Sequence, residues 1–203
     1  GIEAQELSFS SIKSYATPRR LAVLVSNLQI RQEDKTVQRK GPAVSAAFDA
    51  NGEPTKAALG FAQSCKTTID QVDRLKTDKG EWLYFEMAQP GQDVDKLLPQ
   101  IVSQSLEKLP IPKRMRWGDK ENEFVRPVHW LVMLLGKQVI EANILGIDAS
   151  NTTHGHRFHS PDPVTIREPT DYASLLEEEC HVIVDFEQRR TRIKEQVEAK
   201  GSV

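Results

Sequence analysis

The sequence predicts an α+β fold built from mixed, largely antiparallel sheets with packed helices. Side chains alternate in character through residues 82–87, as they do in a strand with two different faces. Apolar side chains recur at helical spacing within residues 93–109. Asn51-Gly52 and Asp78-Lys79-Gly80 are turn sequences, so neighbouring segments are expected to reverse direction and pair in antiparallel fashion.

Near the start of the chain, residues 21–25 are all apolar and follow a turn at Thr17-Pro18. This pattern predicts a well-buried strand. Residues 31–40 are rich in charge and predict an exposed connection. Lys40-Gly41-Pro42 is expected to interrupt the chain at the end of that connection.

A turn, a short helix and a hairpin are predicted next. Asn-Gly readily supplies the positive φ values of a tight reversal, which places a turn in residues 49–54. The helix is expected over residues 55–64, with Thr55 as its N-cap. Residues 74–89 predict a hairpin that turns at Asp78-Lys79-Gly80.

The strongest predicted helix covers residues 93–109. Pro110 and Pro112 end it, because proline lacks the N–H that continues a helix. Its apolar side chains fall on one stripe, so the helix is expected to pack against a core. The stripe consists of Val94, Leu97, Leu98, Ile101, Val102 and Leu106.

Residues 128–135 and 138–145 predict two paired strands joined through Gly136-Lys137. Residues 154–158 predict a further strand or the approach to one. Beyond Ser160 the chain is predicted to alternate short strands with helices, at residues 164–166, 171–179, 181–184 and 186–199.

Thr170 and Asp185 are the predicted N-caps of the last two helices. Because the pattern changes at Ser160, we expect two parts. Residues 1–160 would form an α+β core domain, and residues 161–203 a smaller α/β subdomain.

Composition excludes two classes of protein. The formal net charge is -2, so the chain as a whole is not a basic nucleic-acid clamp, and RNA contacts would come from local clusters. No apolar run approaches the roughly eighteen residues that a membrane span requires. Cys65 and Cys180 stand alone and far apart, which predicts two buried thiols and favours a cytoplasmic protein.

The first candidate RNA contact is Arg19-Arg20, beside the rigid turn at Thr17-Pro18. Two guanidiniums held in a fixed geometry can bind phosphate. In the alternative interpretation the pair marks a solvated strand entrance, with one arginine paired to a carboxylate.

The second candidate is the basic loop, which we define as Lys113, Arg114 and Arg116 between Pro112 and Trp117. Three cations on a loop stiffened by proline can grip a backbone phosphate, and Trp117 can stack on a base or on an arginine. The alternative is that the apolar side chains anchor the loop in the core while the cations point to water.

Arg126 precedes Pro127, which favours an extended backbone at Arg126. His129 comes just before an apolar run. It is expected to be a half-buried, hydrogen-bonded histidine rather than a general base.

His154 and His156 would share one face of a strand, a spacing that can bind a metal ion. No cysteine or carboxylate accompanies them at a recognised distance, so no metal site is predicted. A polar surface strand, or a phosphate contact through Arg157, is the favoured interpretation.

Known catalytic motifs are absent from the sequence. It contains no Gly-x-x-x-x-Gly-Lys phosphate loop, no Gly-x-Ser-x-Gly elbow and no His-Glu-x-x-His zinc motif. No catalytic residue is therefore predicted, and the residues by themselves indicate a binding or scaffold segment.

Six stretches resemble, in order, the beta subunit of the bacterial two-subunit glycyl-tRNA synthetase. Each is modest alone, but six in the same order are specific. The family's usual opening segment is expected upstream of Gly1. The stretches are TPRRL at 17–21, RKGPA at 39–43, TDKGEWL at 77–83, PIPKRMRWG at 110–118, FVRPVH at 124–129 and GHRF at 155–158.

This resemblance implies a glycine–tRNA ligase, which joins glycine to its tRNA using ATP and contains two alpha and two beta chains. The alpha chain would hold the class II aminoacylation core with its ATP and magnesium, so no cofactor is expected in this segment. The beta chain would bind tRNA and support assembly. Its partners would be the alpha subunit, tRNA for glycine and a second beta subunit, with no membrane.

The resemblance also implies a fold like the editing-type module of the phenylalanyl-tRNA synthetase beta subunit, followed after Val203 by an HD-like domain and an anticodon-binding domain. Two alternatives stay open for this segment: an editing-like hydrolase acting on mischarged tRNA, and a purely structural scaffold. The predicted tRNA contacts are Arg19, Arg20, Lys113, Arg114, Arg116, Trp117, Arg126, His156 and Arg157.

Overall fold

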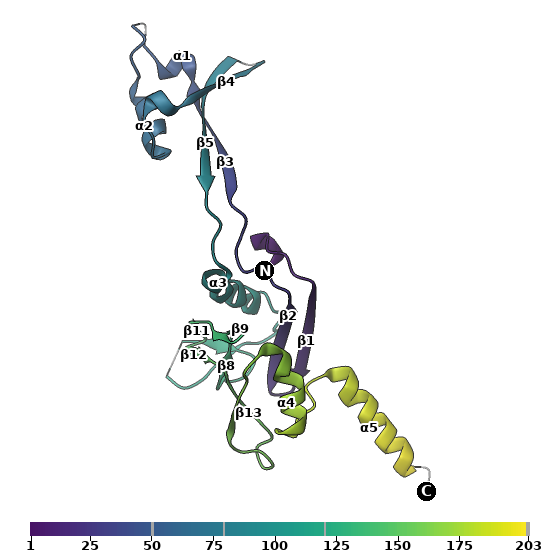
Figure 1. Ribbon diagram of the computed structural model, residues 1–203. Coiled ribbons are helices and arrows are strands. Elements are labelled where there is room, and N and C mark those ends of the chain that lie inside the picture. The colour runs from purple at the N-terminus through teal and green to yellow at the C-terminus, as the bar shows by residue number, and fades with distance from the viewer. Residues whose placement is uncertain (50, 79, 120, 202–203) are drawn as a thin grey trace. The chain divides into compact units, whose positions relative to one another are not determined.

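The computed structural model describes residues 1–49, 51–78, 80–119 and 121–201. Helices and several antiparallel sheets make up this part of the chain, which confirms the predicted α+β class (Figure 1). The chain divides into two compact units. The first unit comprises Gly1–Gln32 and Gln92–Val203, and the second unit, Glu33–Gly91, is inserted between them.

The boundary predicted near Ser160 falls inside the first unit, and a subdomain over residues 161–203 stays a prediction. The likeness to the phenylalanyl-tRNA synthetase editing module also stays a prediction. No helix in the described residues is both long and apolar enough to cross a membrane.

The second unit is a three-stranded antiparallel sheet with two helices packed on it. Leu83 is fully buried at the centre of the sheet, under Ala47 and Ala58 of the two helices. The strands lie in the order β3-β5-β4. The elements are β3 (Lys35–Ala43), α1 (Val44–Ala47), α2 (Lys56–Ser64), η2 (Ile69–Gln71), β4 (Asp73–Thr77) and β5 (Gly80–Gln89).

The predicted hairpin is confirmed, because β4 and β5 pair from Asp73↔Tyr84 to Thr77↔Gly80. Lys79 of its turn lies outside the described residues. The predicted helix is confirmed as α2, with Thr55 at the N-cap position. The Thr55 side chain does not cap the helix but donates its hydroxyl hydrogen to the backbone of the preceding helix.

Residues 31–40 are largely exposed, as predicted, but the prediction that they form a connection is wrong. Most of this segment belongs to β3, which pairs with β5 from Lys35↔Gln89 to Lys40↔Tyr84 and continues, after an irregularity, to Ala43↔Trp82. An edge strand tolerates charged, exposed side chains because its backbone supplies the hydrogen bonds. Charge alone therefore did not exclude a strand.

Helix α3 (Val94–Glu107) organises one part of the first unit. Val94, Leu97 and Ile101 pack with Leu7 near the start of the chain. A neighbouring stretch of the same helix covers a second core around Ile140, and Leu98 contacts both. The predicted apolar stripe is confirmed, and it serves two adjacent cores.

A series of very short strands lies between residues 115 and 150, and the part of this series that packs in the second core spans residues 131–149. The strands are β6 (Met115–Arg116), β7 (Glu123–Phe124), β8 (Leu131–Val132), β9 (Leu134–Leu135), β10 (Gln138–Val139), β11 (Asn143–Ile144) and β12 (Ile147–Ser150). β9 and β10 pair around Gly136, as predicted. The long paired strands expected at 128–135 and 138–145 are wrong, because β8 pairs with β12 in parallel and the chain changes partners every few residues.

A third core of the first unit lies beneath the N-terminal hairpin. Tyr15 packs there with Leu176, Cys180 and Val184. Both cysteines are buried free thiols, as predicted. The elements around this core are β1 (Ser11–Thr17), β2 (Arg20–Ser26), β13 (Thr152–His154), β14 (Pro163–Thr165), η3 (Pro169–Asp171) and α4 (Tyr172–Glu178), preceded in the chain by η1 (Glu3–Gln5).

Two details after Ser160 differ from prediction. The N-cap of α4 is Asp171 rather than Thr170, because η3 takes up the preceding residues. The strand predicted at 181–184 is wrong: His181 takes a positive φ of 55°, which turns the chain after α4, and Val184 is buried without joining a sheet.

The last helix, α5 (Phe186–Gly201), begins at the predicted cap. Asp185 Oδ1 accepts hydrogen bonds from the N–H groups of Glu187 and Gln188, at 3.1 and 3.2 Å. Its other oxygen lies 2.8 Å from Lys13 Nζ of β1. Lys13, followed by the backbone N–H of Gln188, holds the pKa of the Asp185 carboxyl below its ordinary value.

We expect Asp185→Asn to remove a pH-dependent part of the stability. A carboxyl whose pKa is lowered by folding stabilises the fold above its unfolded pKa of about 3.9, and loses this contribution as the pH falls through its folded pKa. In urea unfolding, the wild type should be more stable than the variant at neutral pH. The difference should shrink as the pH drops below about 4.

Glu81→Gln is the matched control, because it removes an exposed pair with Lys76 at 4.0 Å. It should produce no comparable dependence on pH. A gap between wild type and Asp185→Asn that is constant down to the lowest pH of cooperative unfolding would contradict the assignment.

Candidate nucleic-acid interface

Arg20 joins two of the predicted RNA-binding stretches. Its Nη2 donates hydrogen bonds to the carbonyl oxygens of His154 and Gly155, the second at 3.0 Å. Its guanidinium carbon lies 5.6 Å from the centre of the Trp130 ring, and that ring lies 5.0 Å from the His154 ring. The stretch at 17–21 and the stretch at 155–158 are therefore held side by side.

Through these contacts Arg20 holds two segments of the chain together. Its guanidinium is half-buried, and burial lowers its pKa below the ordinary value for arginine. Arg19, in contrast, is exposed at the turn between β1 and β2, where its N–H bonds the Thr17 hydroxyl at 3.3 Å. Of the two arginines, Arg19 is the one available to a phosphate.

The segment that Arg20 holds continues into what we call the aromatic loop, residues 155–159. His156 N–H donates to the Cys180 carbonyl, and Ser160 N–H donates to the His156 carbonyl, both at 2.8 Å. His156 Nδ1 accepts from the N–H groups of Phe158 and His159, both at 3.3 Å. Its Nδ1 is thus an acceptor, which places the ring proton of neutral His156 on Nε2.

Gly155 shows how closely this loop is packed. A Cβ at this position would lie 2.7 Å from the Ser160 Cβ and 3.0 Å from the Cys180 Cβ. No larger side chain fits without a shift of the surroundings. The loop is therefore fixed at its base by backbone hydrogen bonds and close packing.

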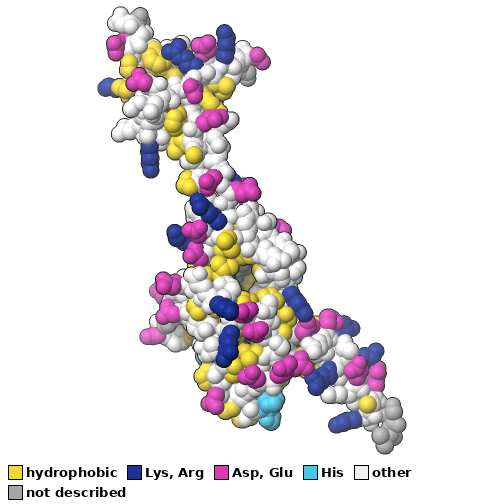
Figure 2. All heavy atoms as spheres, in the orientation of Figure 1, with side chains coloured by type: hydrophobic (Ala, Val, Ile, Leu, Met, Phe, Trp, Pro, Cys, Tyr) yellow, Lys and Arg dark blue, Asp and Glu magenta, His cyan; other side chains and the backbone are white. Residues whose placement is uncertain are grey.

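The fixed loop presents aromatic and basic side chains to solvent. Phe158 is 81% exposed, the highest value among the exposed large hydrophobic side chains of the described chain. Arg157 and His159 are also exposed. Figure 2 shows histidine side chains gathered in one patch on the surface of the first unit.

The basic loop is also divided between anchoring and exposed residues. Arg114 Nη2 donates to the carbonyls of Leu106 and Glu107 at the end of α3, at 3.3 and 2.8 Å. Both carbonyls belong to the last turn of the helix, and that of Leu106 also accepts the N–H of Leu109 at 3.3 Å. Lys113 and Arg116 are exposed. One cation thus holds the loop while two point to water.

The remaining predicted residues have simpler surroundings. Trp117, which follows β6 in the chain, is half-buried, and Arg126 is exposed. His129 is exposed as well, so the prediction of a half-buried histidine is wrong. It lies outside the short strands, where an apolar sequence to one side does not ensure burial.

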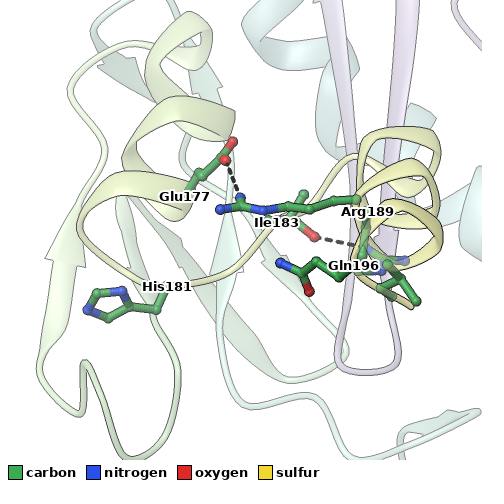
Figure 3. Close-up of a pocket in the computed structure, with 7 residues that line it drawn as sticks. Glu177, His181, Ile183, Arg189 and Gln196 are labelled. Carbon is green, nitrogen blue, oxygen red and sulfur yellow. Dashed lines mark hydrogen bonds and ion pairs between the residues drawn. The ribbon is translucent and has the colours of Figure 1, made fainter. Parts of the chain in front are cut away.

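A hollow of about 330 Å³ lies between the end of α4, the segment after it and α5 (Figure 3). Two arginines line it, but both already form an ion pair or hydrogen bonds within the chain. Arg192 Nη1 is paired with Glu177 at 3.0 Å, and Arg189 donates to the carbonyls of Ile183 and Ala16 at 2.8 and 3.0 Å. Because these charges and donors are already satisfied, the hollow is a poor site for a phosphate.

The described residues show little that would support catalysis or metal binding. No group of three or more His, Cys, Asp and Glu side chains is placed there to hold a metal ion. His154 stacks near Trp130, while His156 bonds the aromatic loop. Burial raises the pKa of the Cys180 thiol, which disfavours the nucleophilic thiolate.

Three side chains of the surface around the aromatic loop were not predicted from the sequence. Phe158 and His159 adjoin a predicted contact, and an aromatic residue between Arg and His within a polar stretch was a usable indication. His181 lies in a separate segment of the chain, and its ring centre is 5.8 Å from that of His159. Local sequence holds no sign of that proximity.

A family model described as "Glycyl-tRNA synthetase beta subunit" matches residues 1–202. The chain belongs to this family. The resemblance inferred from the six stretches is thereby confirmed. Proteins called "Glycine--tRNA ligase beta subunit" are similar to it over nearly its whole length.

The protein of that name from Hahella chejuensis is 54% identical over 198 residues, or 98% of this chain. The corresponding proteins from Chromohalobacter salexigens and Coxiella burnetii are 48% and 49% identical over 100% and 99% of this chain. In each case the match covers 29% of the relative. The chain thus spans less than a third of the length of these curated relatives.

We expect Arg20→Gln to lower the free energy of unfolding by about 1–3 kcal/mol, because the shorter side chain leaves two partly buried carbonyls without their donor. Arg19→Gln should change it by less than about 0.5 kcal/mol. Urea unfolding of both variants measures the difference. Equal effects of the two substitutions would contradict the division into an anchor and an exposed arginine.

A second prediction concerns the base of the aromatic loop. Gly155→Ala should destabilise the protein by about 1–3 kcal/mol through overpacking against Ser160 and Cys180. Gly60→Ala, in α2 where a Cβ meets nothing within 4 Å, should instead stabilise by about 0.5–1 kcal/mol. Thermal unfolding would disprove the packing argument if Gly155→Ala behaved like Gly60→Ala.

Proposed function

We propose that this chain is part of glycine–tRNA ligase and that it contributes tRNA contacts rather than the aminoacylation site. Family membership over residues 1–202 and the names of its relatives support the enzyme. The class II core, ATP and magnesium are proposed to lie on the alpha subunit. In this chain the sequence contains no phosphate-binding glycine loop, and the described residues present no metal-binding group for them.

The observation that carries the RNA-binding role is the basic loop. Arg114 fixes the loop to the end of α3, while Lys113 and Arg116 are exposed on either side of it. A cation on a fixed backbone loses little freedom when it meets a phosphate, so binding is stronger than on a mobile tail. A chain with net charge -2 would bind RNA through such local sites.

The same proposal includes the partners of the family. The chain would assemble with the alpha subunit and with a second beta subunit, and would act on tRNA for glycine in the cytoplasm. Other contacts to tRNA are proposed at Arg19, Arg126 and Arg157, which are exposed.

The alternative of an editing-like hydrolase has no such support. Within the residues that the structure describes, burial raises the pKa of the Cys180 thiol, and His156, whose N–H donates to the Cys180 carbonyl, accepts a hydrogen bond within the aromatic loop. A scaffold without RNA contact remains the alternative to exclude.

The test is the salt dependence of tRNA binding by the full-length protein that contains this chain. Lys113→Ala/Arg116→Ala should reduce the slope of log Kd against log salt concentration by about two, because each lost phosphate contact removes about one unit. Filter binding over a series of salt concentrations measures it.

Lys56→Ala/Lys194→Ala, which removes two exposed lysines elsewhere, is the charge-matched control. Its slope should stay close to that of the wild type. An unchanged slope for Lys113→Ala/Arg116→Ala, or no salt-dependent tRNA binding by the wild type, would support the scaffold instead.

A further inference from the structure

The aromatic loop and the start of the segment after α4 together form a row of rings. The centres of the His156 and Phe158 rings lie 6.1 Å apart, and those of His156 and His159 lie 4.6 Å apart. The His159 ring in turn lies 5.8 Å from that of His181. Four aromatic rings from two separate segments thus follow one another along the surface.

We propose that this row binds unpaired nucleotides of RNA, whose bases stack on Phe158 and on the neighbouring imidazoles while Arg157 meets a phosphate. The inference rests on the proposed tRNA-binding function and names the part of the RNA that this surface takes. It adds to that function a preference for unpaired RNA. The basic loop needs only a phosphate backbone, whereas the row of rings needs a base that is not paired.

The exposure of Phe158 is the first argument. A phenyl ring that is 81% exposed gains nothing from the core of its own chain. Phe186, also exposed, differs because the Arg189 guanidinium carbon lies 5.5 Å from the centre of its ring. No cation–ring contact of this kind is found at Phe158 among the described residues, so its face is open to a partner.

The rigidity of the loop is the second argument. Arg20 bonds the carbonyl groups at its start, His156 Nδ1 bonds two of its N–H groups, and the Cys180 carbonyl holds His156. The backbone that carries His156, Phe158 and His159 is therefore held in place before any ligand arrives. A prearranged platform avoids the ordering cost that a flexible loop would add to binding.

The chemistry of the row points to single strands rather than to duplex RNA. Bases in a duplex are stacked on one another and offer no free face, while unpaired bases stack on Phe and His side chains and on arginine. Arg157 precedes Phe158 in the chain, which supplies a cation for the adjoining phosphate.

The experiment compares Phe158→Ala with the wild type in the full-length protein, using tRNA, a 12-nucleotide unpaired RNA and a duplex RNA of equal length. Stacking is worth about 1–3 kcal/mol per base, so affinity for the unpaired RNA should fall about tenfold. Duplex affinity should not change. The salt slope should also stay the same, in contrast to the basic-loop variant, because stacking releases no counterions.

Phe158→Trp should keep the affinity for the unpaired RNA, and Phe186→Ala is the matched control and should leave it unchanged. Since Phe158 lies on the surface, Phe158→Ala should unfold at the wild-type urea concentration, which separates binding from folding. Affinity fully retained in Phe158→Leu would overturn the stacking role, because leucine keeps the apolar volume without the ring.

Three further outcomes separate this inference from the function on which it rests. If tRNA binding depends on Lys113 and Arg116 but Phe158→Ala binds the unpaired RNA like the wild type, the row is not a nucleotide site and the proposed function stands. If Phe158→Ala instead releases a protein subunit without affecting RNA, the row is a protein interface. If the wild type binds neither tRNA nor the oligonucleotide, both proposals fail.

Discussion

The hydrogen bonds of Arg20 are the constraint on which the candidate interface depends. One guanidinium, brought in by the N-terminal hairpin, bonds two consecutive carbonyl groups of a segment more than 130 residues later in the chain. Trp130 covers the same guanidinium. A charged group that is half-buried must keep its hydrogen-bond partners, so the hairpin and the start of the aromatic loop are held together.

The basic residues of this chain consequently fall into two kinds. The Nη2 atoms of Arg20 and Arg114 donate to backbone carbonyls, whereas Arg19, Lys113 and Arg116 are exposed beside them. Arginine suits the first task because its planar group offers several donors in a fixed fork. In both places an anchoring arginine next to an exposed cation gives the surface charge a defined position, which a mobile side chain on a mobile loop would lack.

The sequence predicted those features that depend on neighbouring residues. The helix at α3, the hairpin of β4 and β5 and the Asp185 cap follow from spacing, turn chemistry and a local hydrogen bond. The strand β3 was missed because its evidence is a partner, β5, that lies far along the chain. The strand expected at 181–184 failed for the converse reason: its apolar residues serve the core, and no neighbouring strand pairs with it in the described chain.

The features of the candidate site also divide into those that the sequence identified and those that only the structure revealed. Sequence by itself determined the family, through six ordered stretches, the α+β class and the residues rich in positive charge, since all three depend on the order of the amino acids along the chain. Only the tertiary structure decided that Arg20 and Arg114 are anchors, that Phe158 is open, and that His181 joins His159. Burial and long-range hydrogen bonds depend on which distant segments meet, and those meetings decide whether a cation or a ring is left for a ligand.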